Sequence, residues 1–174
     1  MSCEIDAGYS KGCRNGRGGV KSVIFIQIEH VTSFALTATN EVSAIVIAST
    51  FQGWQFNLEM NLSTFTDTLT GSRENGSLFA EQSLTAILND NLIATRNTLM
   101  LLAQNDCVAI VQLANGDYEM LGATNGLSVV TDTRDVGTVK ADRNGHTIVM
   151  AGQEDELAYK VDSTIIAGLL TPAP

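Results

Sequence analysis

Proline occurs only twice in this chain of 174 residues, and both copies lie in the last three positions. Charge is also scarce, because Asp, Glu, Lys and Arg make up only 17% of the residues. The hydrophobic fraction of 44% argues against a disordered chain and suits one globular domain. A surface with so little charge is typical of a face covered by neighbouring subunits, and equally of a β protein rich in Thr and Asn.

Basic residues are the scarcest charges, with ten against nineteen acidic ones and a net charge of −9. Four of the ten lie near the N-terminus, and beyond residue 40 the chain has six basic residues and sixteen acidic ones. This balance argues against a general nucleic-acid binder, which needs a basic face. An acidic surface repels DNA phosphate, so it is suited to lining a channel for DNA without gripping it.

Long apolar runs are missing as well. The longest, such as Ala44–Ala48 and Leu99–Ala103, are far too short to span a membrane, and the polar, Gly-rich N-terminus does not resemble a signal peptide. We therefore expect the protein to be made and folded in a cytoplasm. Its three cysteines, Cys3, Cys13 and Cys107, cannot all pair within one chain, and a reducing cytoplasm disfavours bridges.

The pattern predicts an irregular, flexible N-terminal arm over residues 1–19 and a single β-rich domain over residues 20–174. The arm contains five glycines and no periodic pattern, and it either orders against a neighbour or frays. From Val20 onward, short β-branched runs and apolar residues spaced by two predict strands. The expected strands before residue 70 lie at 23–28, 34–38, 44–48, 51–58 and 60–66, with a turn at Asn40–Glu41.

One long α-helix is predicted at about residues 78–104. The stretch Asn75–Gly76–Ser77 supplies a turn and an N-cap in front of it. Leucines and isoleucines then recur at three- and four-residue spacing, which is the pattern of one apolar helix face. The stripe consists of Leu84, Ile87, Leu88, Leu92, Thr95, Leu99 and Leu102.

Two hairpins are predicted after the helix. Cys107–Ala114 and Asp117–Ala123 flank Asn115–Gly116, a pair typical of a two-residue turn in which both residues have positive φ. Thr138–Ala141 and His146–Ala151 flank the longer loop 142–145, with a further strand at 126–132. A last strand is expected at 157–161. The fold class is therefore α+β, mainly an antiparallel β-sandwich or barrel with one long helix.

No credible catalytic, cofactor or metal site is predicted. The glycines of 15–19 match neither a Walker A loop nor a dinucleotide fingerprint. The cysteines and the two histidines, His30 and His146, lack the close spacing of zinc ligands. Cys107 begins an apolar β run and is expected to be buried. Asp142 and the run 154–156 fit solvated loops, and in a ring these acids would be able to face the lumen.

The order of these elements resembles a family of phage structural proteins. The arm 1–14, with Gly18–Gly19–Val20–Lys21 leading into the first strand, resembles the N-termini of small virion proteins of Bacteroidetes-infecting phages, including crAss-like phages. The long helix, the Asn115–Gly116 hairpin and the segment 137–149 are similar to the layout of tail tube and tail ring proteins. The resemblance covers nearly the whole chain and rests on layout and short strings.

The resemblance implies a non-enzymatic subunit of a homo-oligomeric ring of six or twelve copies in the virion tail. Such rings stack on one another and on neighbouring tail or portal-proximal proteins, and DNA passes through without specific binding, cofactor or membrane. Two alternatives stay open. A capsid decoration or tail-completion protein would be a monomer or trimer, and a small cytoplasmic enzyme would use Cys107 or the carboxylates in a concave pocket.

Overall fold

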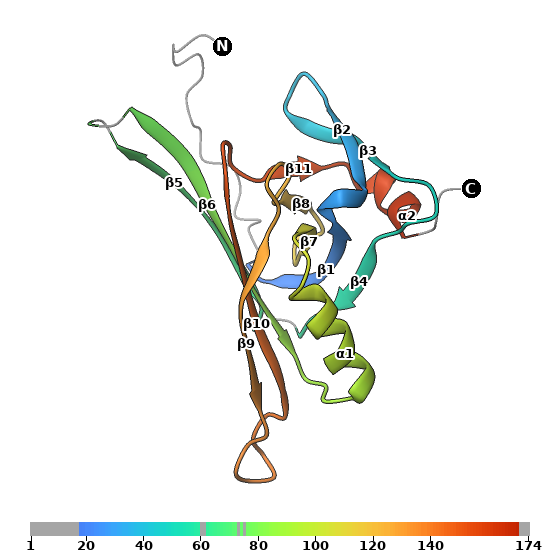
Figure 1. Ribbon diagram of the computed structural model, residues 1–174, viewed down its shortest axis with the longest axis vertical. Coiled ribbons are helices and arrows are strands. Elements are labelled where there is room, and N and C mark those ends of the chain that lie inside the picture. The colour runs from blue at the N-terminus through green and yellow to red at the C-terminus, as the bar shows by residue number, and fades with distance from the viewer. Residues whose placement is uncertain (1–17, 60–61, 73, 75, 171–174) are drawn as a thin grey trace.

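The computed structural model describes residues 18–59, 62–72, 74 and 76–170, which form two sheets and two short α-helices (Figure 1). The larger sheet has seven strands, in the order β2 (Val31–Leu36), β3 (Glu41–Ile47), β11 (Tyr159–Val161), β8 (Tyr118–Leu121), β7 (Cys107–Leu113), β1 (Val20–Gln27) and β4 (Trp54–Asn57). The smaller has four, in the order β5 (Thr64–Ser72), β6 (Ser77–Leu88), β10 (Gly145–Glu154) and β9 (Ser128–Asp135). The helices are α1 (Ile93–Leu102) and α2 (Ile166–Leu169), and 3₁₀ turns span Ile28–His30 and Ser163–Ile165.

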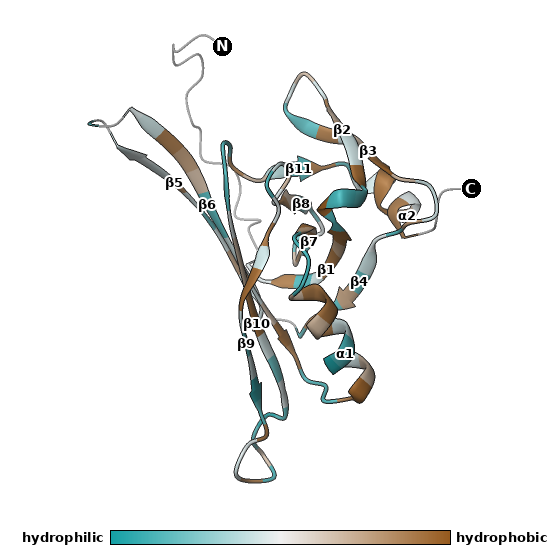
Figure 2. Cartoon of the chain, in the orientation of Figure 1, coloured by the Kyte–Doolittle hydropathy of each residue, from teal (hydrophilic) through white to brown (hydrophobic). Residues whose placement is uncertain are grey.

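The seven-stranded sheet is buried on both of its faces around β1 and β7. Alternate residues of these strands, such as Val23 and Ala109, pack with the four-stranded sheet and α1 in one core. The residues between them, such as Ile24 and Ile110, pack in a second core with β3, β11 and α2. This explains why both strands read as continuous apolar runs rather than alternating ones. Figure 2 shows the hydrophobic residues gathered on these inner strands and on α1.

The predicted fold class is confirmed at the level of a mainly antiparallel, β-sandwich-like α+β structure. The two sheets face one another across the first core, and the only pairing that runs parallel among the described strands joins β3 to β11. Neither sheet closes into a barrel within the described residues, because each retains two edge strands. Of the arm predicted at 1–19, residues 1–17 lie outside the described part of the chain.

The long helix predicted at 78–104 is wrong in its first half. Ser77–Leu88 is strand β6, and only Ile93–Leu102 is helical. Apolar residues at 84, 87, 88 and 92 fit a helix, but Ala80, Leu84 and Leu88 also fit a period of two, and these are the buried ones. Pairing decides between the periods, because β6 is hydrogen-bonded to β5 on one side and to β10 on the other. Of the predicted Asn75–Ser77 helix start, Ser77 is instead the first residue of β6 and pairs with Ser72 of β5, and Asn75 lies outside the described residues.

Helix α1 begins after Asp90 rather than at Ser77. The Asp90 carboxylate accepts hydrogen bonds from the Leu92 backbone N–H at 3.0 Å and from the Thr95 hydroxyl at 2.7 Å. These bonds satisfy polar groups at the start of the helix and hold the pKa of Asp90 below its usual value, with the Thr95 bond the largest cause. The helix covers the first core with Leu99 and Leu102.

The hairpin predicted at Asn115–Gly116 is confirmed, although its turn is not the two-residue type. The Leu113 carbonyl accepts a hydrogen bond from the Gly116 N–H at 3.0 Å, and the Leu113 N–H donates one to the Asp117 carbonyl at 2.9 Å. Of the residues in this turn, only Gly116 has a positive φ, at 99°. Residues 114–116 therefore form a three-residue loop, a type I turn followed by a left-handed glycine.

The second predicted hairpin has a different first strand. Residues 138–141 lie in a loop, and β10 pairs instead with β9, which begins at Ser128 and runs beyond the 126–132 strand that the sequence suggested. The connection between β9 and β10 therefore spans residues 136–144. The strand expected at 157–161 is confirmed as the shorter β11, and the apolar segment after it forms α2.

Gly145 marks the tight approach of β10 to the end of β6, and we expect Gly145→Ala to destabilise the protein. A Cβ at this position would lie 2.0 Å from the Leu88 carbonyl oxygen and 3.0 Å from Asn89 Cα. Because both are backbone atoms, the strand itself must shift, and we expect a loss of about 1–3 kcal/mol in the free energy of unfolding. Chemical denaturation measures this loss.

The matched control is Gly168→Ala on α2, where an added Cβ meets nothing within 4 Å. We expect its free energy of unfolding to stay within about 0.5 kcal/mol of the parent. Equal stability of Gly145→Ala and the parent would contradict the packing described for the end of β6.

Candidate functional site

The four-stranded sheet has one face in the core and one face on which Thr and Ser are the most frequent residues, beside a few apolar ones such as Ile87 and Val149. On β6 the residues Gln82, Leu84 and Ala86 are buried, whereas Ser83 and Thr85 between them point away from the core. The registers of the neighbouring strands place their Thr and Ser residues on that same outer side. We call this side the hydroxyl face, and its Thr and Ser residues are Thr64, Thr66, Thr68, Thr70, Ser72, Ser77, Ser83, Thr85, Ser128, Thr131, Thr133 and Thr147.

Charge on the hydroxyl face is sparse and mainly negative. Among the described strand residues on this side, the charged ones are Glu81 and Asp135. The guanidinium of Arg143 reaches its lower margin from the β9–β10 connection, where it lies 3.5 Å from the Asp135 carboxylate and 2.6 Å from the Thr147 hydroxyl. The single described cation at this face is thus already paired, which leaves little to bind phosphate.

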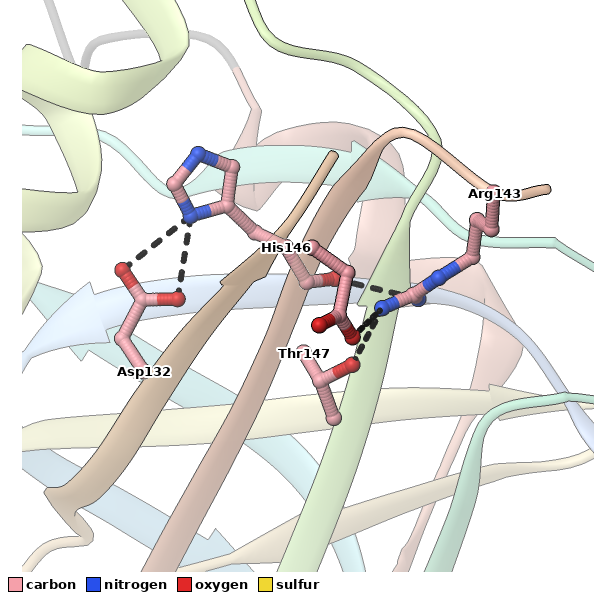
Figure 3. A network of polar contacts seen from close by, with 5 residues as sticks. Asp132, Arg143, His146 and Thr147 are labelled. Atoms are coloured by element: carbon pink, nitrogen blue, oxygen red, sulfur yellow. Dashed lines mark hydrogen bonds and ion pairs between the residues drawn. The ribbon is translucent and has the colours of Figure 1, made fainter. Parts of the chain in front are cut away.

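Polar side chains form contacts on both sides of β10 (Figure 3). Arg143 lies on the hydroxyl side, and His146 lies on the core side with its Nδ1 3.0 Å from Asp132. Because a carboxylate only accepts hydrogen bonds, the proton of this pair sits on Nδ1. Nε2 of His146 is buried and has no hydrogen-bond partner within the described structure. The pair fixes the lower end of β9 to β10 beside α1.

The two edge strands of the four-stranded sheet are long, and neither pairs with a further strand among the described residues. β5 has nine residues and pairs only with β6, and β9 has eight and pairs only with β10. Edge strands of this length present a row of free backbone donors and acceptors, which is a template for pairing with another chain. Natural monomers usually shorten or block such edges. The β9 edge carries one irregularity, at the exposed Val130, which lies between the paired Val129 and Thr131.

The connection between β9 and β10, residues 136–144, is a built structure at the lower end of the sheet. The Asp142 carboxylate accepts hydrogen bonds from the backbone N–H groups of Thr138 and Val139 and from the Thr138 hydroxyl, at 2.7–2.9 Å. Asp142 N–H closes a turn onto Val139 C=O at 3.0 Å. These bonds hold the pKa of Asp142 below its usual value. Asp142 is therefore a structural carboxylate, and Lys140 lies midway along the connection.

The acidic run 154–156 is split by the structure. Glu154 is buried and accepts hydrogen bonds from the backbone N–H groups of Thr124 and Asn125, so it fixes a neighbouring loop. Asp155 and Glu156 are exposed past the end of β10. Since the three carboxylates point to different environments, they do not form an acid–base pair.

Cys107 and His30 both line a hollow of about 510 Å³ between α1 and β4, together with Phe51, Trp54 and other apolar side chains. Burial raises the pKa of the Cys107 thiol to about 11, so the thiol stays protonated at neutral pH and is a poor nucleophile. The His30 ring stacks on Phe51 with centroids 3.5 Å apart. Cys107 is thus the buried small hydrophobe that the sequence indicates.

Several sequence candidates fall elsewhere. Cys3, Cys13 and residues 15–17 of the glycine-rich stretch lie outside the described residues. Within the described part of the chain, no three His, Cys, Asp or Glu side chains are grouped closely enough to hold a metal ion. The described helices are also too short or too polar for any of them to cross a membrane.

The hydroxyl face was missed from the sequence, although a signal for it is present. Thr64, Thr66, Thr68 and Thr70 alternate along one strand, and a period of two in threonine marks a β surface that is polar on one side. The matching residues on β6 were hidden by the helical interpretation of 78–104. Without that strand, the threonines had no neighbours with which to form a surface.

Comparison with known protein families, with curated proteins and with solved structures finds no match to this chain. The functional conclusion therefore rests on the geometry of the four-stranded sheet.

The lowered pKa of Asp142 makes the order of the 136–144 connection dependent on pH. A carboxylate with a depressed pKa contributes its full stabilisation above the ordinary value of 3.8, and this is lost as pH falls through the lowered value. We expect the amides of Thr138 and Val139 to be protected from exchange at neutral pH and to lose protection only in strong acid. Amide exchange followed by NMR measures this.

Asp142→Ala should remove the same protection at neutral pH, because the acceptor is gone. Asp106→Ala, which removes an exposed aspartate outside this loop, serves as the control and should leave both amides unchanged. Protection that persists in Asp142→Ala would contradict the capping role.

Proposed function

We propose that this protein is a structural subunit that works by assembly, and that copies join through their four-stranded sheets into a closed ring. The observation that carries the proposal is the pair of long open edges on β5 and β9, at opposite sides of one sheet. Edge-to-edge pairing of β9 in one copy with β5 in the next satisfies both rows of free backbone groups. A head-to-tail contact of this kind closes into a ring when its rotation permits.

The strand directions support such pairing. All neighbours in the sheet β5-β6-β10-β9 run antiparallel, so β5 and β9 point in opposite directions. A second copy related by rotation about the ring axis therefore brings its β5 antiparallel to the first copy's β9. Because each copy contributes an even number of strands, the alternation continues without a break around the ring.

The dimensions suit a conduit. Six copies would contribute 24 strands, and at about 4.8 Å per strand these give a barrel roughly 115 Å around and about 37 Å across, before strand tilt widens it. In this arrangement the cores and α1 lie outside, and the hydroxyl face lines the lumen. Twelve copies would give a barrel twice as wide.

The chemistry of the hydroxyl face suits the passage of DNA. Phosphate binding needs unpaired Lys and Arg, whereas the described strand residues of this face carry only Glu81 and Asp135 as charges. Short hydroxyl side chains form hydrogen bonds with water, so they keep the surface hydrated without adding positive charge. We therefore infer a tail tube or head–tail ring of a phage virion, made in the bacterial cytoplasm, that contacts neighbouring tail proteins and lets the genome pass.

The first test combines light scattering after size exclusion with negative-stain imaging of the purified protein. We expect rings of six or more copies with an open centre. A monomer or trimer over a broad concentration range would overturn the ring and would favour a capsid decoration or tail-completion protein.

The edge itself is tested with Val130→Asp. Val130 is 61% exposed on the β9 edge, so a carboxylate there stays solvated in the monomer and becomes buried when a neighbour pairs with β9. We expect an unchanged circular dichroism spectrum and loss of the ring. The control is Val46→Asp on β3 of the other sheet, where Val46 is 51% exposed, and it should assemble normally. Normal rings from Val130→Asp would contradict pairing through β9.

A further inference from the structure

The upper end of the four-stranded sheet carries apolar side chains that face the core side but have no core to meet. Leu69 and Leu78 lie on the same side of the β5–β6 hairpin as the buried Ala80, yet they are 49% and 63% exposed. The hairpin extends past the body of the protein at this end (Figure 1). Together with Leu157, which is 47% exposed, these residues line an open groove of about 920 Å³. We call it the upper groove.

Three acidic side chains also contribute to the upper groove. Glu41, Asp155 and Glu156 line it, and no described Lys or Arg forms an ion pair with any of the three. Lys160 also lines the groove, but its ammonium group lies 3.8 Å from the Asp117 carboxylate. The Glu156 carboxylate accepts a hydrogen bond from the Tyr159 hydroxyl at 2.8 Å. The groove thus combines an exposed apolar floor with three carboxylates that form no ion pair with a described Lys or Arg.

The opposite end of the same sheet carries the complementary features. The 136–144 connection projects at the lower end of the molecule, away from the β5–β6 turn (Figure 1). Val136 and Val139 are 64% and 65% exposed on it, and Lys140 lies beside them without a described ion-pair partner. The bonds to Asp142 hold this tip in one conformation, so little conformational entropy remains to be lost on docking.

We infer that the upper groove binds the 136–144 tip of a second copy of this chain, stacked above it along the sheet axis. Val139 and Val136 fill the apolar floor between Leu69, Leu78 and Leu157, and Lys140 reaches the Asp155 and Glu156 carboxylates. The inference rests on the proposed ring, in which it supplies the contact between one ring and the next.

Both partners of this contact exist on every copy, at opposite ends of one rigid sheet. Such a contact is heterologous and does not close on itself, so it repeats along an axis and produces a stack of rings. The contact also covers the exposed leucines of the hairpin, which a free monomer would not be expected to keep, and it places the positive charge of Lys140 beside the carboxylates of the groove. A stack built in this way has one direction, with all tips pointing the same way.

The test exchanges the charges of the proposed pair. Lys140→Glu and Glu156→Lys each place like charges in contact, and the double variant restores an opposite-charge pair. We expect each single variant to form rings but to reduce the fraction of stacked rings about tenfold or more, because every ring contributes one such contact per subunit. We expect the double variant to stack again. Negative-stain imaging counts single rings and stacks.

Two matched variants control for net charge. Lys21→Glu on β1 and Glu29→Lys after it make the same charge changes at exposed positions away from both the tip and the groove, and should stack as the parent does. Stacking unaffected by Lys140→Glu, or not restored in the double variant, overturns this contact while the ring itself stands.

A cross-linking measurement separates this inference from the ring. Cys3 and Cys13 are first replaced by Ser, and Val139→Cys and Leu157→Cys proteins are then mixed under mild oxidation. We expect a disulfide-linked dimer of the two, and none when Val46→Cys replaces Leu157→Cys. A dimer obtained without ring formation supports the tip–groove contact but not the ring, and absence of the dimer overturns the contact in either case.

Discussion

The alternation of side chains along β6 is the constraint on which the rest of this structure depends. Ala80, Leu84 and Leu88 must face the core, and a slip of one residue would expose all of them and bury Ser83 and Thr85 instead. Since β5 and β10 pair with β6 along most of its length, that register is passed to the whole four-stranded sheet. It sets which threonines form the hydroxyl face, and it leaves the open edges on β5 and β9.

The same register separates the two ends of the molecule. The β5–β6 turn lies at one end of the sheet and the 136–144 connection at the other, so the apolar hairpin residues and the capped, basic tip are held apart by a rigid element. Burial of β1 and β7 on both faces anchors the sheet to the body. The proposed ring and stack both use surfaces that this arrangement leaves unsatisfied, and neither requires a catalytic group.

Much of the seven-stranded sheet was predictable from the sequence because its strands are short, apolar and separated by clear turns. The prediction failed at residues 77–88, where Leu84 and Leu88 fit the periods of a helix and of a strand alike, and where long-range pairing decides. It failed again at 138–141, where the sequence predicts a strand. The hydrogen bonds from Thr138 and Val139 to the Asp142 carboxylate stabilise a loop there instead. The hydroxyl face was missed partly because of the first error, and partly because a surface shared by four strands is defined only once their registers are known.

The most direct test of the account is hydrogen–deuterium exchange on the assembled and the dissociated protein, compared strand by strand. Pairing between copies predicts that amides of β5 and β9 exchange rapidly in the dissociated subunit and become protected together on assembly, while those of β2 and β4 at the edges of the other sheet change little. Protection confined to the seven-stranded sheet or to α1, with β5 and β9 unchanged, would contradict the account.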